Sequence, residues 1–337
     1  MECEAESRGA SVSRSIHRRT FLTSSAGLAL AAALPATTAR AAAAVRISTA
    51  FTLPGDRPYP EGIALDPYTG DAYVGSYTTG AVYRAAAGSR AAQVFLPAGA
   101  DGRNTANGLK VDRSRRLWVI DSTAGVDVYD LRTSTLLARF TVPGSDPSFV
   151  NDLAIGPDGT AYLTDSTRPV VYRVTPADLR RVRGGSATLD AAYDLSAVAP
   201  ADGLFLNGIV ADPAGRCLFV VGMTGGGLYR VTTASGAVSQ VALNGGDLTH
   251  GDGLELAHGT LWAAHNASNT ISRWRLSADG SSARLERRFT DTALQIPTTL
   301  ARTHGRLLVV RSQFDKGGPM GPGVPEEPFT VAWVDGI

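Results

Sequence analysis

The sequence lacks an excess of charge of either sign. Among its 337 residues, 32 Lys and Arg stand against 31 Asp and Glu, and no Lys/Arg cluster stands out after residue 40. Nucleic-acid binding relies on a basic surface that neutralises phosphates, so it is not expected here. The composition, 44% hydrophobic and 19% charged, is that of a globular protein.

The sequence also lacks a hydrophobic run long enough to favour a permanent membrane span. Its main apolar stretch lies within "SIHRRTFLTSSAGLALAAALPATTARA", residues 15–41, after the pair Arg18 and Arg19. A basic segment, an apolar segment and a small-residue end are typical of a cleaved export signal, and the Arg pair resembles the twin-arginine type. We therefore expect residues 1–41 to be removed. Residues 42–337 would then be a secreted or extracytoplasmic protein that is not attached to a membrane.

Cysteine is nearly absent. Cys3 lies in the expected signal, which leaves Cys217 alone in the mature chain. No intramolecular disulfide is then possible, so the exported protein must be held together by its core.

Helical periodicity is nearly absent as well, since residues 175–182 ("TPADLRRV") form the one plausible turn of helix. A repeat is present instead, and its units start 46, 44, 56, 45 and 45 residues apart. Each unit has short apolar runs separated by Gly, Pro and Asp turns, which is typical of a four-stranded blade. The units start at Glu61, Asn107, Asn151, Asn207, Asp252 and Pro297.

This repeat predicts an all-β fold, a six-bladed β-propeller with four antiparallel strands per blade. The sixth unit has no fourth strand after "FTVAWVDG", whereas "VRISTAFTL" is unpaired before the first unit. We expect this N-terminal strand to complete the last blade, because closure removes two open sheet edges.

The first strand of each blade lines the central channel, so the starts of these strands should meet at one channel mouth. Two acids and three amides would then point at one axis. Acids held close together repel each other unless a cation lies between them. Carboxylate and amide oxygens without Cys or His favour Ca²⁺ before Mg²⁺, and Ca²⁺ takes about 6 to 8 oxygen ligands.

"YPEGIALD" and the later Asn, Asn-Gly and Asp-Gly strand starts resemble the calcium-dependent six-bladed hydrolases. This family includes the senescence marker protein (regucalcin), the gluconolactonases and diisopropyl fluorophosphatase. The resemblance implies that one Ca²⁺ is held by Glu61, Asn151, Asn207 and Asp252. It also implies a metal-dependent hydrolase of lactones, esters or related electrophiles that acts on a small-molecule substrate. We expect the protein to be a monomer.

One position departs from the sugar lactonases of this family. They tend to have an Arg two residues before the Asn of the third blade, where this chain has Phe149. With Tyr59 and Phe205 at equivalent positions, we expect an aromatic mouth and a fairly apolar lactone or ester as substrate. Asn107 is an additional amide, either for substrate contact or for an ordinary turn.

Proton transfer at this mouth has three candidates. Asp252 would deprotonate the attacking water or attack directly, and His250 and His265 are placed by the repeat at the same mouth. Other mouth residues are candidates for substrate contact, with turn capping as the alternative for the two acids. These residues are Asp121, Asp165 and Arg311.

Two alternatives remain open at the level of sequence. One is a non-catalytic extracellular binding propeller in which Ca²⁺ only clamps the channel, and the other is a condensing enzyme similar to strictosidine synthase. The Gly/Pro-rich segment 312–329 joins two strands of the sixth blade at the same mouth. It is either a lid or a loose loop.

Overall fold

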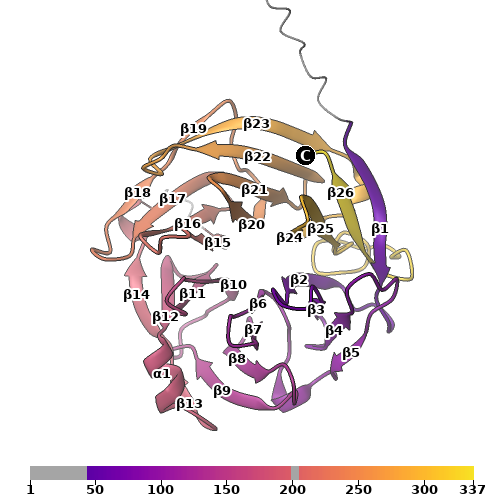
Figure 1. The fold of residues 1–337 in the computed structure, drawn as a ribbon, viewed down its shortest axis with the longest axis horizontal. Coiled ribbons are helices and arrows are strands. Elements are labelled where there is room, and N and C mark those ends of the chain that lie inside the picture. The colour runs from indigo at the N-terminus through magenta and orange to yellow at the C-terminus, as the bar shows by residue number, and fades with distance from the viewer. Residues whose placement is uncertain (1–43, 199–204) are drawn as a thin grey trace, which may run out of the picture. The chain divides into compact units, whose positions relative to one another are not determined.

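The computed structural model describes residues 44–198 and 205–337; the expected export signal lies outside the described residues. Six small sheets form a ring around a central channel (Figure 1). The predicted six-bladed β-propeller is therefore confirmed, with four antiparallel strands in every blade. No helix in the described ranges is long and apolar enough to cross a membrane.

The strands of each blade follow one another from the channel outward. Blade 1 contains β2 (Pro60–Leu65), β3 (Ala72–Ser76), β4 (Val82–Ala85) and β5 (Gln93–Leu96). Blade 2 contains β6 (Leu109–Val111), β7 (Arg116–Asp121), β8 (Gly125–Asp130) and β9 (Leu136–Thr141). Blade 3 contains β10 (Val150–Ile155), β11 (Ala161–Asp165), β12 (Val170–Val174) and β14 (Asp190–Asp194).

The second half of the ring follows the same order. Blade 4 contains β15 (Leu206–Ala211), β16 (Cys217–Gly222), β17 (Gly227–Thr232) and β18 (Val238–Gln240). Blade 5 contains β20 (Gly251–Ala257), β21 (Thr260–His265), β22 (Thr270–Leu276) and β23 (Ser282–Thr290). Blade 6 contains β24 (Pro297–Thr303), β25 (Arg306–Arg311), β26 (Thr330–Asp335) and β1 (Arg46–Thr52).

The N-terminal strand completes the last blade, as the unpaired sequence predicted. Strand β1 pairs antiparallel with β26, from Arg46 opposite Asp335 to Thr52 opposite Thr330. Both strands thereby lose an open edge that would otherwise be free to pair with another chain.

Two short strands were not expected from the repeat. Strand β13 (Ser186–Thr188) pairs in parallel with β9, and β19 (Ala242–Asn244) pairs in parallel with β23. Each adds a fifth strand to the outer edge of a neighbouring blade and so covers that edge.

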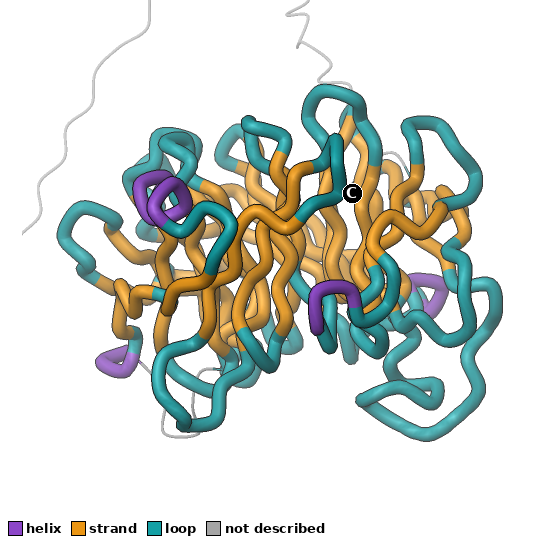
Figure 2. The backbone as a smooth tube through the Cα atoms, turned by 90° about the horizontal axis from the view of Figure 1, so that it is seen from below, coloured by secondary structure: helices purple, strands orange, loops and turns teal. Residues whose placement is uncertain are grey.

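The expected turn of helix is α1 (Pro176–Arg181), which begins with a capping box between Thr175 and Asp178. Three short 3-10 helices complete the elements, η1 (Ala100–Gly102), η2 (Ser196–Val198) and η3 (Thr292–Leu294). Loops gather on two opposite faces of the ring, and α1 lies on the face away from the three 3-10 helices (Figure 2). The α1 insertion in the longer third repeat therefore lies on the face opposite the predicted mouth (Figure 2).

Glycine follows the start of the innermost strand because neighbouring inner strands pass very close to each other. A Cβ atom on Gly62 would lie 2.1 Å from the carbonyl oxygen of Asn107, and one on Gly208 would lie 2.1 Å from that of Asp252. The repeated Glu-Gly, Asn-Gly and Asp-Gly pairs thus record a packing requirement as well as turn chemistry. Blade 3 has Asp152 at the glycine position, and its side chain is buried.

Blade 6 requires a correction to the sequence alignment. Pro297 pairs with Arg311 in the same way that Pro60 pairs with Ser76. Pro297 is therefore equivalent to Pro60, and the residue equivalent to Glu61 is Thr298. We call the six equivalent residues the inner ring, which comprises Glu61, Asn107, Asn151, Asn207, Asp252 and Thr298.

Candidate functional site

Four inner-ring side chains carry buried oxygens that have no hydrogen-bond partner. The residues are between 2% and 6% exposed, so water does not satisfy these atoms freely. Buried polar atoms are normally paired, and an unpaired one costs free energy. Four such atoms at one end of the channel indicate a candidate binding site for a ligand that these oxygens can contact. The atoms are Glu61 Oε2, Asn107 Oδ1, Asn151 Oδ1 and Asn207 Oδ1.

The two best-defined amides are held with their oxygens free. Asn151 donates from Nδ2 to Ser166 Oγ at 2.9 Å, and Ser166 in turn donates to the carbonyl oxygen of Leu206. Asn207 directs Nδ2 to the sulfur of Met223 at 3.5 Å. Because the NH₂ groups are used in these contacts, the orientation of each amide leaves Oδ1 for another ligand.

Two carboxylates come together from distant parts of the chain. Asp252 on β20 and Glu61 on β2 are both buried, and burial raises the pKa of each above its ordinary value. The charge of Asp252 raises the pKa of Glu61 further, and Asp152 adds to the effect. Acids in this situation favour a nearby cation because it offsets both desolvation and repulsion.

The donor set fits a hard divalent ion. It consists of two carboxylates and three amide oxygens, the type of ligand that Ca²⁺ takes in proteins. In the part of the chain that the structure describes, no three His, Cys, Asp or Glu side chains gather around one point. A zinc-like ligand set is thus not found there, and the unpaired amide oxygens carry the argument for Ca²⁺.

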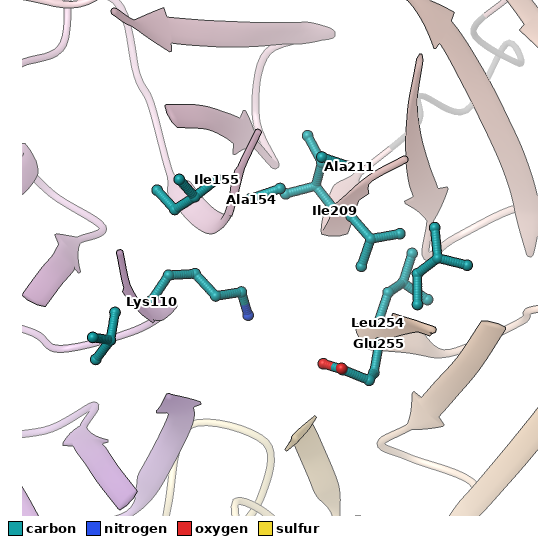
Figure 3. A pocket seen from close by; sticks show the side chains of 10 residues that line it. Lys110, Ala154, Ile155, Ile209, Ala211, Leu254 and Glu255 are labelled. Carbon is teal, nitrogen blue, oxygen red and sulfur yellow. The ribbon is translucent and has the colours of Figure 1, made fainter. Parts of the chain in front are cut away.

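The opposite end of the channel has a different chemistry. Lys110, Glu255 and several aliphatic side chains surround a cavity of about 210 Å³ formed by the later residues of β6, β10, β15 and β20 (Figure 3). The Lys110 ammonium lies 4.0 Å from Asp152 Oδ1. Burial raises the pKa of Glu255 to about 7, while the charges of Lys110 and Arg302 oppose the shift. Lys110 therefore supplies positive charge behind the inner ring.

His250 is placed as expected at the mouth. It is exposed, lies two residues before Asp252, and has a positive φ of 60°. Its backbone N–H donates to Met223 and its carbonyl oxygen accepts from Asn266, so the backbone is fixed. No hydrogen bond to the ring is found among the residues that the structure describes.

His265 has a structural environment. Its Nδ1 lies 2.8 Å from the carbonyl oxygen of Thr249, and its Nε2 lies 2.7 Å from Ser272 Oγ. A carbonyl can only accept, so Nδ1 carries the proton and Nε2 accepts from the hydroxyl. Burial lowers the pKa of His265 to about 4. Both nitrogens are engaged, so the ring is not free to transfer protons at the mouth.

Asp121 and Asp165 cap the turns that follow their strands. Asp121 accepts from the backbone N–H groups of Asn104 and Thr123, and Asp165 accepts from those of Phe149 and Thr167. Each carboxylate therefore joins the turn after its strand to the loop that enters the same blade. Asp121 and Asp165 therefore act as turn caps, the alternative to substrate contact. The hydrogen bonds with backbone N–H groups occupy both carboxylates.

The three expected aromatic residues differ in exposure. Tyr59 is only 3% exposed, packs against Phe314 and Phe329, and donates from its hydroxyl to the carbonyl oxygen of Lys316. Its ring is part of the core beneath segment 312–329, in contrast to the expected substrate contact. Phe149 is half-buried, and Phe205 is 42% exposed.

Arg311 is also directed away from the inner ring. Its Nη1 donates to the hydroxyls of Thr49 and Thr330, on the two outer strands of its own blade. Pairing within blade 6 explains why this guanidinium does not reach the channel mouth.

Segment 312–329 is anchored at several points. Gln313 and Glu326 exchange two hydrogen bonds of 2.7 and 2.9 Å, and Lys316 forms an ion pair of 2.6 Å with Glu326. Phe314 and Phe329 are buried, whereas Met320 and Val324 are exposed. The segment is thus a fixed rim of the mouth with an exposed apolar tip, rather than a loose loop.

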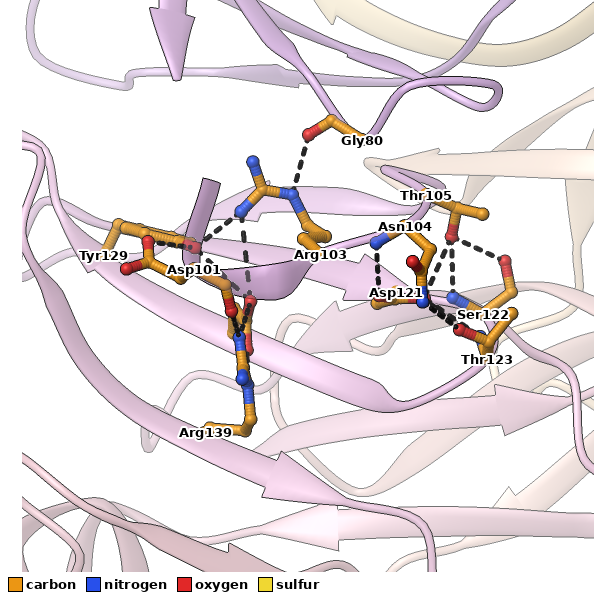
Figure 4. A network of polar contacts seen from close by, with 11 residues as sticks. Gly80, Asp101, Arg103, Asn104, Thr105, Asp121, Ser122, Thr123, Tyr129 and Arg139 are labelled. Atoms are coloured by element: carbon orange, nitrogen blue, oxygen red, sulfur yellow. Dashed lines mark hydrogen bonds and ion pairs between the residues drawn. The ribbon is translucent and has the colours of Figure 1, made fainter. Parts of the chain in front are cut away.

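A buried arginine fixes the loop that leads to Asn107. Arg103 donates from Nε to the carbonyl oxygen of Gly80 and from Nη1 to the hydroxyl of Tyr129 (Figure 4). Nearby, Thr105 contacts Ser122 Oγ at 2.9 Å. These contacts tie the entry of blade 2 to blade 1, and so position the Asn107 side chain.

Sequence reasoning missed a second ring. The residue directly after the second strand of a blade lies beside the inner-ring residue of that blade. Ser166, Met223 and Asn266 contact Asn151, Asn207 and Asp252, respectively. The repeat could have revealed these three residues, because each follows the last residue of the second strand of its blade, and those last residues were already aligned.

Comparisons with known proteins support the fold. No protein-family model and no curated protein sequence matches the chain. Among solved structures, a gluconolactonase from Xanthomonas campestris is similar with a TM-score of 0.60 and 16% identity, over 86% of this chain and 89% of that chain.

Two further solved structures of similar fold are a lyase and an allergen. Virginiamycin B lyase from Staphylococcus aureus is similar with a TM-score of 0.54 and 11% identity, over 87% of this chain and 99% of that chain. The Malassezia sympodialis allergen Mala s 1 is similar with a TM-score of 0.57 and 16% identity, over 83% and 93%. At these identities the likeness extends to the propeller fold alone.

Proposed function

We propose that this protein is a Ca²⁺-dependent hydrolase of small, fairly apolar lactones or esters. The observation that carries the proposal is the set of four unpaired, buried oxygens beside Asp252 at one channel mouth. The similarity in fold to a gluconolactonase supports the same class of reaction. The export signal over residues 1–41 and a monomeric, extracytoplasmic protein are part of the proposal.

Glu61, Asn151, Asn207 and Asp252 would hold the ion, with Asn107 as a fifth oxygen donor. When bound, Ca²⁺ would supply positive charge that stabilises the negative oxygen formed during hydrolysis. Ser166, Met223 and Asn266 keep three of these side chains in the required orientation.

Hydrolysis adds the oxygen of water to the carbonyl carbon and breaks the bond from that carbon to the leaving oxygen. The Asp252 carboxylate would accept the proton that the attacking water loses. His250, whose ring is exposed at the mouth, would return a proton to the leaving oxygen. The products are a carboxylic acid and an alcohol, which are joined in one hydroxy acid when the substrate is a lactone.

The surroundings of the mouth favour an apolar substrate. Phe205, Met320 and Val324 are 42%, 43% and 78% exposed, and all three belong to segments on the mouth side of the ring. Exposed apolar side chains on the face that carries a polar site favour contact with an apolar ligand. A polyhydroxylated sugar lactone would lack partners for its hydroxyls at these positions.

The test is hydrolysis of δ-valerolactone, D-glucono-δ-lactone and 4-nitrophenyl butyrate, with added Ca²⁺ and with a chelator. We expect turnover of the apolar substrates only with Ca²⁺. Asp252→Asn should lower kcat by at least about 100-fold, whereas the exposed Asp190→Asn should leave it unchanged. Full activity of Asp252→Asn, or of the wild type in chelator, would refute the proposal.

The same experiment separates the enzyme from a binding propeller. A protein in which the ion only clamps the channel would gain thermal stability from Ca²⁺ and hydrolyse none of the three substrates. Stabilisation without turnover would therefore favour the binding alternative.

A further inference from the structure

The second ring has the same backbone geometry in five blades. In each, the backbone N–H of the second-ring residue donates to the carbonyl oxygen of the residue two positions before the inner-ring residue, over 2.8 to 3.3 Å. This repeated bond shows that the positions are structurally equivalent. The donors are Tyr77, Ser166, Met223, Asn266 and Ser312, and the acceptors are Tyr59, Phe149, Phe205, His250 and Ile296.

Side chains at these positions reach the inner ring in three blades, whereas in blade 6 Ser312 Oγ donates to the carbonyl oxygen of Ile296. In blades 3, 4 and 5 the second-ring side chain contacts the inner-ring side chain directly, at 2.9, 3.5 and 2.7 Å. By the same register, Tyr77 of blade 1 belongs beside Glu61.

Tyr77 differs from the other members of the second ring. It is the aromatic member, and its side chain is much longer than those of the serines and the asparagine. Its ring packs against Phe314 with a centroid separation of 5.4 Å, so the rim segment holds it in place.

The phenol of Tyr77 is available for a ligand. The residue is half-buried, and no hydrogen bond occupies its hydroxyl within the described residues. The neighbouring Tyr59, by contrast, uses its hydroxyl to bind Lys316. A tyrosine phenol has an ordinary pKa of about 10, so it keeps its proton at neutral pH and can act as an uncharged hydrogen-bond donor.

We propose that Tyr77 is a catalytic residue that donates a hydrogen bond to the carbonyl oxygen of the substrate. This inference rests on the proposed function. The oxygen gains negative charge when water attacks, and a fixed donor at that position stabilises the transition state more than the ground state. The phenol retains its proton throughout, so Asp252 and His250 still carry the proton transfers.

Tyr77→Phe tests the inference because it removes the hydroxyl and keeps the ring on Phe314. We expect kcat for 4-nitrophenyl butyrate to fall by about 10- to 100-fold, with Ca²⁺ affinity and melting temperature unchanged. Binding of n-butylphosphonate, an anion that resembles the transition state, should weaken by a similar factor in calorimetry with Ca²⁺ present. Tyr59→Phe is the matched control and should retain kcat.

Two results would overturn the assignment. One is an unchanged kcat and an unchanged affinity for n-butylphosphonate in Tyr77→Phe. The other is weaker Ca²⁺ binding in this variant with kcat restored at saturating Ca²⁺, which would make Tyr77 a support for Glu61. A wild type without Ca²⁺-dependent turnover would instead refute the proposed function, so the two failures are distinguishable.

Discussion

Asn266 donates a hydrogen bond from Nδ2 to Oδ2 of Asp252 at 2.7 Å, linking the end of β21 to the start of β20. The amide cannot turn freely, because Asn266 Oδ1 accepts from the backbone N–H of Ala267 at 2.6 Å. Asp252 is thus held by a donor that is itself fixed. Partners of this kind orient metal ligands and commonly affect affinity as much as the ligands do.

Asn266→Ala should therefore weaken Ca²⁺ binding by about 10- to 100-fold, because Asp252 loses its fixed donor. Titration calorimetry on the purified protein measures the change. Asn244→Ala, at an exposed position of β19, is the control and should bind Ca²⁺ like the wild type. Equal affinities of the wild type and Asn266→Ala would remove Asn266 from the site.

Glu61→Gln should affect the stability of the folded protein in opposite directions with and without Ca²⁺. In chelator the variant should be at least as stable as the wild type, because burial and the charge of Asp252 make the Glu61 carboxylate costly. With Ca²⁺ at about 100 times its Kd the wild type should gain about 2.7 kcal/mol, and the variant much less.

Melting temperatures of the wild type and Glu61→Gln, measured in chelator and with Ca²⁺, test whether the order of their stabilities reverses. Glu327→Gln changes an exposed carboxylate of the rim segment and should follow the wild type in both. Parallel responses of Glu61→Gln and wild type to Ca²⁺ would mean that Glu61 does not bind the ion.

His265 should make the protein less stable in mild acid. Its pKa of about 4 in the folded protein is below the value near 6.5 expected after unfolding, so the unfolded state takes up the proton first. The stabilisation is present above about pH 6.5 and is lost as pH falls toward about 4, with a loss of about 2 kcal/mol at pH 5.

Urea unfolding of wild type and His265→Gln at about pH 7.5 and about pH 5 tests this contribution. The variant is expected to lose about 2 kcal/mol less than the wild type between the two pH values. His304→Gln removes an exposed imidazole and should behave as wild type. An identical pH dependence in all three proteins would contradict the buried, neutral state of His265.

Gly208→Ala should destabilise the propeller by about 3 kcal/mol, since the added Cβ would lie 2.1 Å from the carbonyl oxygen of Asp252. Gly185→Ala is the control, because its Cβ would meet only Val182 at 3.4 Å and its backbone has no positive φ. Urea unfolding compares the two variants. A cost for Gly208→Ala no larger than that for Gly185→Ala would show that the inner strands can separate without loss.

The fold could be predicted because its repeat appears directly in the sequence. The inner strands need Gly next to the inner-ring residue, and this requirement recurs in four blades and marks the register. Blade 6 has Thr299 in place of this glycine, so its inner-ring residue was predicted to be Pro297 and is Thr298 in the structure. Thr298 is uncharged, and its hydroxyl donates to the backbone carbonyl oxygen of Glu61. No acidic or amide side chain therefore marks this position in the sequence of blade 6.

The site was predicted less completely, because a strand position does not specify where a side chain points. Tyr59 and Arg311 occupy the expected positions, yet contacts with Lys316, Thr49 and Thr330 turn them away from the channel. Several of these partners lie far away in the sequence. Tyr77 was not a candidate at the level of sequence, because its proposed role rests on the pairing of β2 with β3, which places residue 77 one position after the partner of Pro60.

The pairing of β1 with β26 also sets the order of events during synthesis. Among the described strands, β1 is synthesised before all the others and β26 after them, so blade 6 stays incomplete until β26 has been made. Joining the two ends carries the entropy cost of closing a very long loop, which slows the final step. Until β1 and β26 pair, β26 presents an open edge that another chain could pair with, so the closing pair of strands also protects the protein from edge-to-edge association.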